Sequence, residues 1–152
     1  MNKEISIRPG NANDVPQVLA LIQELADFEK EPDAVLVTET ELLEDGFGEN
    51  PAYELIVAEH NGKLLGMSLY YYRYSTWKGR CLYLEDLIVT EDSRGKGIGK
   101  SLFIATVNVA KAANCRKMNW QVLDWNQPAI DFYKLFQAEL DEEWINGSLS
   151  FM

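Results

Sequence analysis

The chain begins with a segment that predicts a strand and a segment that predicts a helix. Residues 4–8 alternate between apolar and polar side chains, as in a half-buried strand. Apolar residues then recur at helical spacing over 15–26. Asn13 or Asp14 can cap this helix, and Pro16 suits its first turn. We therefore expect a first strand followed by an amphipathic helix.

A second helix and a hairpin are predicted next. Thr38 and Glu41 have the spacing of a capping box, which predicts a short helix. Asn61-Gly62 then separates two runs, 53–60 and 63–75, that are rich in β-branched and aromatic residues. Asn-Gly between such runs is a strong hairpin signal, so we expect two antiparallel strands here.

The second half of the chain carries five more segments. Residues 80–90, RCLYLEDLIVT, are apolar at nearly every position and predict a strand. The spacing over 98–109 predicts a helix of about four turns. A strand over 117–125 and a helix over 126–136, opened by Asn-Gln-Pro, follow. A second Asn-Gly hairpin is expected over 140–152.

These segments define the fold class. Their order is β, α, α, β, β, β, α, β, α, β, β, which predicts an α/β fold with a mixed sheet. The length of 152 residues suits one domain with a sizeable core, spanning residues 1–152. The hydrophobic content of 47% and charged content of 25% are ordinary for a soluble globular protein.

Charge and cysteines narrow the class of partner and compartment. A net charge of −10 argues against nucleic acid and is compatible with a cationic partner, or with solubility alone. No signal peptide or membrane-spanning run is evident, so no membrane association is expected. Cys81 and Cys115 lack metal-type spacing and predict reduced thiols in a cytoplasmic protein. His60 has no second ligand nearby in the sequence, and we expect no metal.

The glycine-rich segment 94–101, RGKGIGKS, resembles a phosphate-binding loop between a strand and a helix. A nucleotide-hydrolase loop, G-x-x-x-x-G-K-[ST], needs glycine where Arg94 stands. A dinucleotide-binding loop, G-x-G-x-x-G, needs glycine where Lys100 stands. The remaining pattern is R-x-x-G-x-G, in which glycines and free helix N–H groups let the backbone approach an anion. A flexible surface turn is the alternative.

The R-x-x-G-x-G pattern and further segments carry a resemblance to a known family. The pattern is the acyl-CoA signature of GNAT N-acetyltransferases. IQELADFEK, LLEDGFGENP, LYLEDLIV, RGKGIG and DWNQPAIDFYK resemble the diamine (spermidine/spermine) acetyltransferase subfamily. YSTWKGR and VLDWNQ are most similar to its thialysine acetyltransferase branch. The resemblance covers about residues 5–145.

The resemblance implies a single-domain GNAT fold, with a mixed, mostly antiparallel central sheet flanked by helices. It implies acetyl-CoA as co-substrate, a small cationic amine as acceptor, and a homodimer. It places the acetyl-CoA contacts at Leu87, Ile88, Val89, Arg94, Gly95, Lys96, Gly97, Ile98, Gly99, Lys100, Asn126, Gln127, Pro128, Ala129 and Tyr133. It places the acceptor contacts at Phe28, Glu29, Glu85, Asp86, Asn119, Trp120, Gln121 and Glu143.

Two adjacent carboxylates, Glu85 and Asp86, lie within the apolar segment 80–90. Strand alternation places Asp86 on one face with Leu82, Leu84 and Ile88, and Glu85 on the other face with Tyr83, Leu87 and Val89. Buried carboxylates are costly unless they are paired or used. An ion pair with a buried arginine such as Arg73 or Arg80 is one explanation. The resemblance implies the other: Glu85 deprotonates the amine through water, and Asp86 binds the cationic acceptor.

Tyr133 lies on one helical stripe with Ala129, Phe132 and Phe136, which by itself indicates a core residue. The resemblance gives it a different role, as the general acid that protonates the coenzyme A thiolate. A tyrosine has an ordinary pKa of ~10 against ~8.5 for a thiol, so it would act by hydrogen bonding or late transfer.

Two features separate this chain from the family pattern. Gln137 stands where the family usually has glycine, and Met152 ends the chain early, so we expect no C-terminal tail that reaches a dimer partner. Glu29, Glu142 and Glu143 could line an acidic trough, or could be solvated surface. The expected activity is direct acetyl transfer to a diamine, polyamine or thialysine-like amino acid. Alternatives are another small amine, a protein amine, or a non-catalytic acyl-CoA-binding module.

Overall fold

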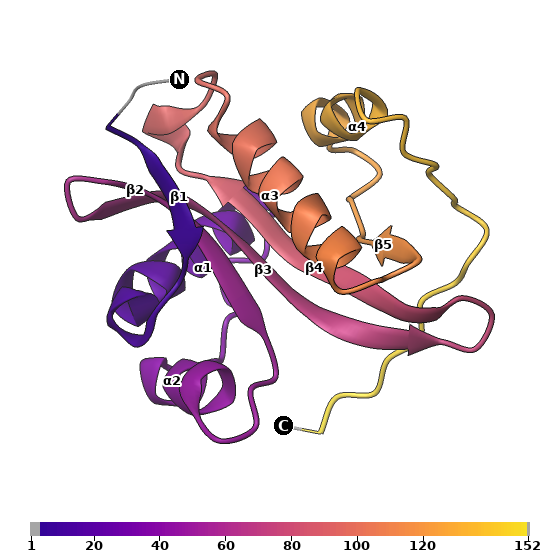
Figure 1. The fold of residues 1–152 in the computed structure, drawn as a ribbon, viewed down its shortest axis with the longest axis horizontal. Helices are drawn as coiled ribbons and strands as arrows, with labels where there is room; N and C mark the ends of the chain where they lie inside the picture. The colour runs from indigo at the N-terminus through magenta and orange to yellow at the C-terminus, as the bar shows by residue number, and fades with distance from the viewer. Residues whose placement is uncertain (1–3, 152) are drawn as a thin grey trace. The chain divides into compact units, whose positions relative to one another are not determined.

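The structure is a computed structural model that describes residues 4–151. The chain divides into two compact units, of which the first ends at Gln121 and the second begins at Val122. The first unit holds, in chain order, β1 (Ser6–Pro9), α1 (Val15–Phe28), α2 (Glu39–Phe47), β2 (Glu54–His60), β3 (Lys63–Ser75), β4 (Gly79–Val89), α3 (Ile98–Ala112) and β5 (Lys117–Asn119). Figure 1 labels these elements.

The strands of the first unit form one sheet in the order β1-β2-β3-β4-β5. The pairs β1–β2, β2–β3 and β3–β4 are antiparallel, and β4–β5 is parallel. The expected mixed, mostly antiparallel sheet is therefore confirmed. The connection from β4 to β5 runs through α3, as a parallel pair requires.

Side chains cap the 3-10 turn that leads into α1 and the start of α2. Asn11 accepts a hydrogen bond from the Asn13 N–H and caps a 3-10 turn, Ala12–Asp14, that leads into α1. Asp14 occupies the N-cap position of α1 but makes no side-chain cap of its own. The Thr38 hydroxyl accepts from the Glu41 N–H at 3.1 Å and caps α2, as its spacing predicts.

The Asn61-Gly62 turn joins β2 to β3 as expected. Asn61 has φ +49° and Gly62 has φ +80°, so both residues are left-handed, as a type I′ turn requires. This turn sets the register of β2 and β3 next to it.

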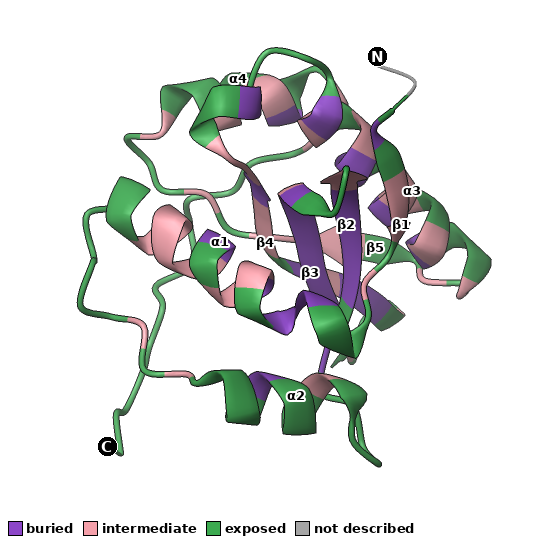
Figure 2. Cartoon of the chain, turned by 90° about the vertical axis from the view of Figure 1, so that its left-hand side faces the viewer, coloured by how far each residue is buried: buried purple, intermediate pink, exposed green. Residues whose placement is uncertain are grey.

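Helices cover the sheet on both faces. In the view of Figure 2, α1 and α3 lie on opposite sides of the strands, and β2 and β3 are largely buried. The core on the α1 and α2 side includes Val15, Val18, Leu21, Leu42, Val57, Met67, Leu69 and Ile88. Because both faces are covered, β2 is buried at four consecutive residues, Leu55 to Ala58.

On the other face, α3 approaches β3 closely. A Cβ on Gly66 would lie 2.6 Å from the Ile88 carbonyl oxygen and 3.1 Å from Leu102 Cδ1, so only glycine fits there. The hydroxyls of Ser68 and Thr106 are 2.6 Å apart and fully buried. Thr106 also donates to the Leu102 carbonyl at 2.8 Å. These contacts fix where the N-terminus of α3 lies relative to the sheet.

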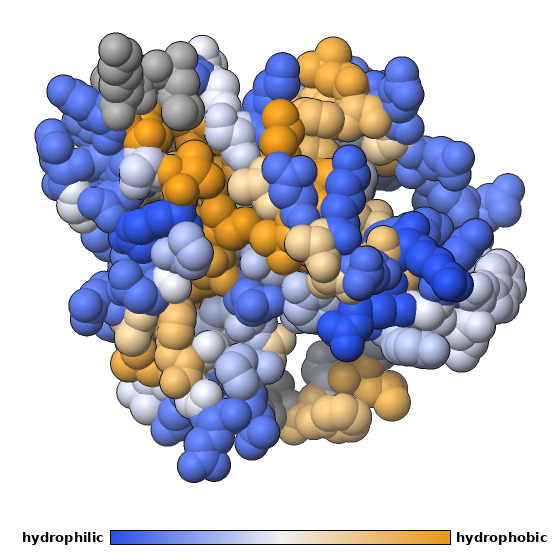
Figure 3. Space-filling model, in the orientation of Figure 1, coloured by the Kyte–Doolittle hydropathy of each residue, from blue (hydrophilic) through white to orange (hydrophobic). Residues whose placement is uncertain are grey.

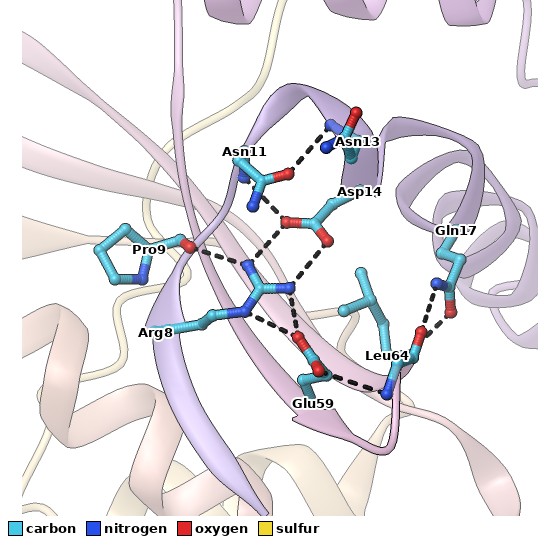
Figure 4. Close-up of polar contacts among 9 residues, drawn as sticks. Arg8, Pro9, Asn11, Asn13, Asp14, Gln17, Glu59 and Leu64 are labelled. Atoms are coloured by element: carbon cyan, nitrogen blue, oxygen red, sulfur yellow. Dashed lines mark hydrogen bonds and ion pairs between the residues drawn. The ribbon is translucent and has the colours of Figure 1, made fainter.

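Arg8 connects three parts of the first unit (Figure 4). Its guanidinium donates to both carboxylate oxygens of Asp14, at 2.8 and 2.9 Å, and to Glu59 at 2.6 and 2.8 Å. The hydrogen bonds from Arg8 hold the pKa of Asp14 below its usual range. The cluster therefore ties β1 and β2 to the start of α1.

The second unit contains α4 (Gln127–Lys134), and the expected helix start is confirmed. The Asn126 side chain accepts from the Ala129 N–H at 3.3 Å and caps this helix, with proline in its first turn. Gln137 follows with φ +61°, a left-handed conformation that favours glycine. This is the position at which the family pattern has glycine, so the chain keeps the turn without the residue that suits it best.

The predicted C-terminal hairpin is wrong for the described residues. Residues 138–151 form neither helix nor strand, and Met152 lies outside the described residues. Trp144 is 75% and Ile145 98% exposed, so the apolar side chains of this segment are not buried. A two-residue turn signal does not hold two strands together without a buried face.

The predicted strand over 117–125 is shorter than expected. β5 spans only Lys117–Asn119, and residues 120–126 lack regular structure. The strand-like run of residues continues to position 125, but only the first three of these residues pair with β4.

Candidate active site

A β-bulge in β4 changes the faces expected for the two carboxylates. Leu84 pairs with Tyr70, whereas Asp86 pairs with the next residue along β3, Leu69, so Glu85 is the extra residue. Successive residues of β3 face opposite sides, so Leu84 and Asp86 do as well. The expectation that Asp86 shares a face with Leu82 and Leu84 is therefore wrong. A one-residue bulge, which alternation cannot show, is the reason.

The bulge brings three carboxylates of the first unit into electrostatic contact. Burial raises the pKa of Asp86 from 3.8 to about 7, with further contributions from Glu85 and from Glu29 at the end of α1. Burial, followed by the charge of Glu85, also raises the pKa of Glu29. The structure thus groups the predicted acceptor residues Glu29, Glu85 and Asp86.

The ion pair considered for these carboxylates is not formed. Among residues 4–151, neither Glu85 nor Asp86 forms an ion pair with Arg73, Arg80 or any other residue. The Asp86 side chain also makes no hydrogen bond within that range of the chain. A largely buried carboxylate without a partner is a suitable binding group for a cation.

Tyr71 on β3 positions Glu85. The Tyr71 hydroxyl donates to Glu85 Oε1 at 3.0 Å, and its ring lies 5.5 Å from the ring of Tyr83. Burial, then the hydrogen bond to Glu85, raises the pKa of Tyr71 to about 12. Tyr71 therefore stays a donor and orients the carboxylate. Sequence analysis did not single out Tyr71, because its partner lies fourteen positions away on another strand.

The end of β4 has an unpaired edge. β5 pairs with β4 only at Cys81, Leu82 and Tyr83, whereas β4 continues to Val89. Leu87, Ile88 and Val89 are paired on the β3 side alone among the described residues. Main-chain groups on the other side of this segment are therefore available to a ligand, as the resemblance implies.

The glycine loop follows this edge and ends at the N-terminus of α3. Gly95 and Gly97 have φ near +80° (+79° and +80°), and a Cβ at either would meet nothing within 4 Å. No side chain caps α3, and its first turn contains no acidic residue. Lys96 and Lys100 are exposed beside it. This arrangement fits an anionic group such as a pyrophosphate.

Arg94 is held against α1. Its Nε donates to the Val89 carbonyl at 3.0 Å, its Nη2 lies 3.7 Å from Glu24 Oε2, and its guanidinium lies 5.5 Å from the centre of the Phe28 ring. Glu24 also accepts from the Thr90 hydroxyl at 2.8 Å and the Glu91 N–H at 3.0 Å. Glu24 thus fixes the start of the glycine loop, a role that sequence analysis missed.

The other predicted residues divide between the two units. In the first, the Phe28 ring supports Arg94, Asn119 pairs with Tyr83, and the Trp120 ring packs edge-on against Phe103 at 5.5 Å. Gln121 ends this unit.

In the second unit, Asn126 caps α4 and the Tyr133 ring lies 5.4 Å from that of Phe132. The main-chain N–H of Glu143 donates to the Asp141 carboxylate at 2.8 Å in the extended segment.

A separate groove of about 830 Å³ lies at the other edge of the sheet. Its lining includes Ile7 of β1, Ile56 of β2, and Ala105 and Val109 of α3. Hydrophobic side chains gather beside α3 on the face shown in Figure 3. Of the predicted site residues, none lines this groove.

The described part of the chain contains neither a candidate group of metal ligands nor a membrane-spanning helix. Residues 4–151 contain no group of three or more His, Cys, Asp or Glu side chains placed to hold a metal ion. None of the helices in that range is both long enough and apolar enough to cross a membrane. Cys81 and Cys115 are both free thiols.

Comparison with known proteins identifies the family. The sequence model of the acetyltransferase (GNAT) family matches residues 19–136. This chain belongs to the GNAT acetyltransferase family. The thialysine N-epsilon-acetyltransferase of Bos taurus is 41% identical over an alignment of 143 residues, which covers 89% of this chain and 84% of that protein.

Two further relatives extend this comparison. The spermidine/spermine N(1)-acetyltransferase-like protein 1 of Homo sapiens is 41% identical over 134 residues, 84% of this chain but 19% of that longer protein. A structure of aminoglycoside N-acetyltransferase AAC(6')-Iy in complex with CoA superposes with a TM-score of 0.77. It shares 18% identity and covers 98% of this chain and 97% of that one. The GNAT fold and an N-acetyltransferase activity are thus assigned.

Proposed function

We propose that this GNAT acetyltransferase moves an acetyl group directly to a primary amine of a small cationic acceptor, either a diamine or polyamine or a thialysine-like amino acid. The observation that carries the proposal is the group of Glu29, Glu85 and Asp86, which has no arginine or lysine partner in the described chain. The thialysine and spermidine/spermine acetyltransferase names of the relatives support the same class of acceptor.

Glu85 and Asp86 have different roles toward the acceptor. Asp86 binds the ammonium, because a mostly buried carboxylate gains most from a cation. Glu85, oriented by Tyr71, removes the proton from the acceptor nitrogen through a water molecule. This step is needed because an alkylamine has an ordinary pKa near ~10 and attacks only when neutral. Phe28, Glu29, Asn119, Trp120, Gln121 and Glu143 are the remaining proposed acceptor contacts.

Acetyl-CoA would supply an acetyl group activated as a thioester. Its pyrophosphate fits the loop from Arg94 to Lys100 and the uncapped start of α3. The unpaired main chain of Leu87 to Val89 would orient the acetyl and pantetheine portion, and an N–H there would polarise the carbonyl. On the second unit, Asn126 to Ala129 would contact coenzyme A, and Tyr133 would give a proton to the departing sulfur.

The test is the initial rate of thiol release from acetyl-CoA with spermidine, putrescine, thialysine, lysine and a lysine-bearing peptide. We expect rapid release with at least one small amine and slow release with the peptide. If acetyl-CoA binds but no amine releases thiol, the chain is a binding module and the proposed activity is wrong.

Glu24 offers a separate test of the coenzyme A site. Glu24→Gln removes the charge that holds Thr90, the Glu91 N–H and Arg94. The loop then samples other positions, and we expect the dissociation constant for coenzyme A to rise about three- to tenfold. Titration calorimetry measures it.

The matched control for Glu24 is Glu91→Gln, which makes the same charge change at the start of the loop that Glu24 contacts. The Glu91 side chain is exposed and makes no hydrogen bond or ion pair with another residue of 4–151. An equal loss of affinity in both variants would mean that net charge, rather than the position of the loop, sets the affinity.

Two finer features are also proposed. From the resemblance we propose a homodimer, and from the two free thiols we propose that the protein works in the cytoplasm, where thiols stay reduced. Light scattering on the purified chain measures the first of these directly.

A further inference from the structure

Arg73 is a cation beside the acidic group on β4. It lies on β3, which runs alongside β4 in one long antiparallel pair (Figure 1). Its guanidinium carbon is 4.8 Å from the centre of the Tyr83 ring, a cation–π contact that holds the group over the ring. Tyr83 in turn packs against Tyr71, which binds Glu85.

The register places Arg73 and the carboxylates on the same face. Leu69, Tyr71 and Arg73 alternate along β3 and pair with Asp86, Tyr83 and Cys81 respectively. Electrostatics agree with this placement. Arg73 acts to lower the pKa of both Tyr71 and Tyr83, whereas Glu85 acts to raise both. Arg73 and Glu85 therefore lie around the same two tyrosine rings.

The N–H groups of the Arg73 guanidinium have no acceptor in the described chain. Among residues 4–151, the Arg73 side chain makes no ion pair and no hydrogen bond, and it is exposed. A planar guanidinium presents N–H donors in a fork that matches a carboxylate. Stacking on Tyr83 holds this fork in place beforehand, which lowers the entropy cost of binding.

The spacing suits one class of acceptor. Arg73 and Tyr71 are two residues apart on β3, outside the bulge, and two residues of a strand span roughly 7 Å. Because the Tyr71 hydroxyl donates to Glu85, roughly this distance separates a group bound at Arg73 from an amine at Glu85. The six bonds between the side-chain nitrogen and the carboxyl carbon of a lysine-like amino acid also span roughly 7 Å when extended.

We infer that Arg73 determines acceptor specificity by binding the carboxylate of an amino acid whose terminal amine lies at Glu85 and Asp86. The protein would thus select amino acids with a second amine over diamines and polyamines, which Arg73 repels. This inference rests on the proposed function and selects among its acceptors.

The experiment compares two acceptors that differ only by the carboxylate. Thialysine and bis(2-aminoethyl) sulfide, its decarboxylated counterpart, are each assayed by thiol release. We expect kcat/KM of the unmodified protein to favour thialysine. Arg73→Leu should lower kcat/KM for thialysine at least about tenfold, mainly through KM, and leave or raise the value for the diamine. Arg73→Lys keeps the charge without the fork and should retain part of the preference.

Arg80→Leu is the matched control. Arg80 lies on the same hairpin with its guanidinium 5.2 Å from the centre of the Tyr72 ring, so the variant makes the same change of charge and stacking. It should leave the preference between the two acceptors unchanged. An equal shift in Arg80→Leu would contradict a specific role for Arg73.

The outcomes separate this inference from the proposed function. If Arg73→Leu changes kcat/KM for both acceptors by the same factor, Arg73 does not bind the carboxylate and the inference is wrong, while acetyl transfer stands. A preference of the unmodified protein for the diamine would also overturn it. If no amine in the larger panel releases thiol, the proposed function itself fails.

Discussion

Tyr133→Phe lowers kcat about 100-fold or more, while coenzyme A still binds. The variant keeps the ring and its packing against Phe132 and removes only the hydroxyl. If that hydroxyl protonates the departing sulfur, its loss affects the chemical step and not binding, because general acid catalysis contributes about 10²–10⁴-fold. Thiol release at saturating acceptor measures kcat, and titration calorimetry measures the affinity for coenzyme A.

Tyr74→Phe is the control for Tyr133. Tyr74 is 78% exposed on β3 and is not among the proposed site residues, so its hydroxyl should be dispensable. A Tyr133→Phe variant with unchanged kcat would show that Tyr133 only packs against Phe132, as its helical stripe alone suggests. The general acid would then have to be sought elsewhere.

Asp86→Asn makes the protein more stable at pH 8 while it weakens acceptor binding. The folded-state pKa of Asp86 is raised from 3.8 to about 7, so the folded chain holds a proton that the unfolded chain releases. The free energy of unfolding therefore falls as pH rises through this window and stays low above pH 7. The neutral asparagine removes this loss, which amounts to about 2–4 kcal/mol.

Urea unfolding at pH 5 and pH 8 tests this prediction, with Asp33→Asn as the control. Asp33 is an exposed residue in the loop after α1, and its substitution should leave the pH dependence as it is. If the free energy of unfolding of Asp86→Asn changes between pH 5 and pH 8 as much as that of the unmodified protein, the Asp86 carboxylate is ionised at both pH values. The raised pKa of Asp86 would then be wrong.

Local sequence signals predicted most elements of the first unit. Each of these signals depends only on residues close to it in the sequence. The Asn61-Gly62 turn, the Thr38 helix cap and the glycine loop between a strand and a helix all lie where they were expected. The family resemblance supplied the fold and the activity, both now assigned. The C-terminal hairpin failed because its turn signal is local, whereas strand pairing needs a buried face.

The detailed site depended on contacts that spacing does not encode. The bulge at Glu85 is set by the pairing of β4 with β3, so alternation along β4 alone assigned Asp86 to the wrong face. Glu24 and Tyr71 bind residues far along the chain, Thr90 and Glu85. Arg73 was considered only as a partner for the carboxylates, and its position over Tyr83 required the fold.

The central claim is acetyl transfer to a small amine, and competition among acceptors tests it most directly. The protein is incubated with acetyl-CoA and equal concentrations of thialysine, lysine, putrescine, spermidine and a lysine-bearing peptide. Mass spectrometry then identifies and quantifies the acetylated products. We expect one small amine, thialysine foremost, to gain a single acetyl group while the peptide stays unmodified. Acetylation of the peptide alone, or intact acetyl-CoA with no acetylated product, would contradict it.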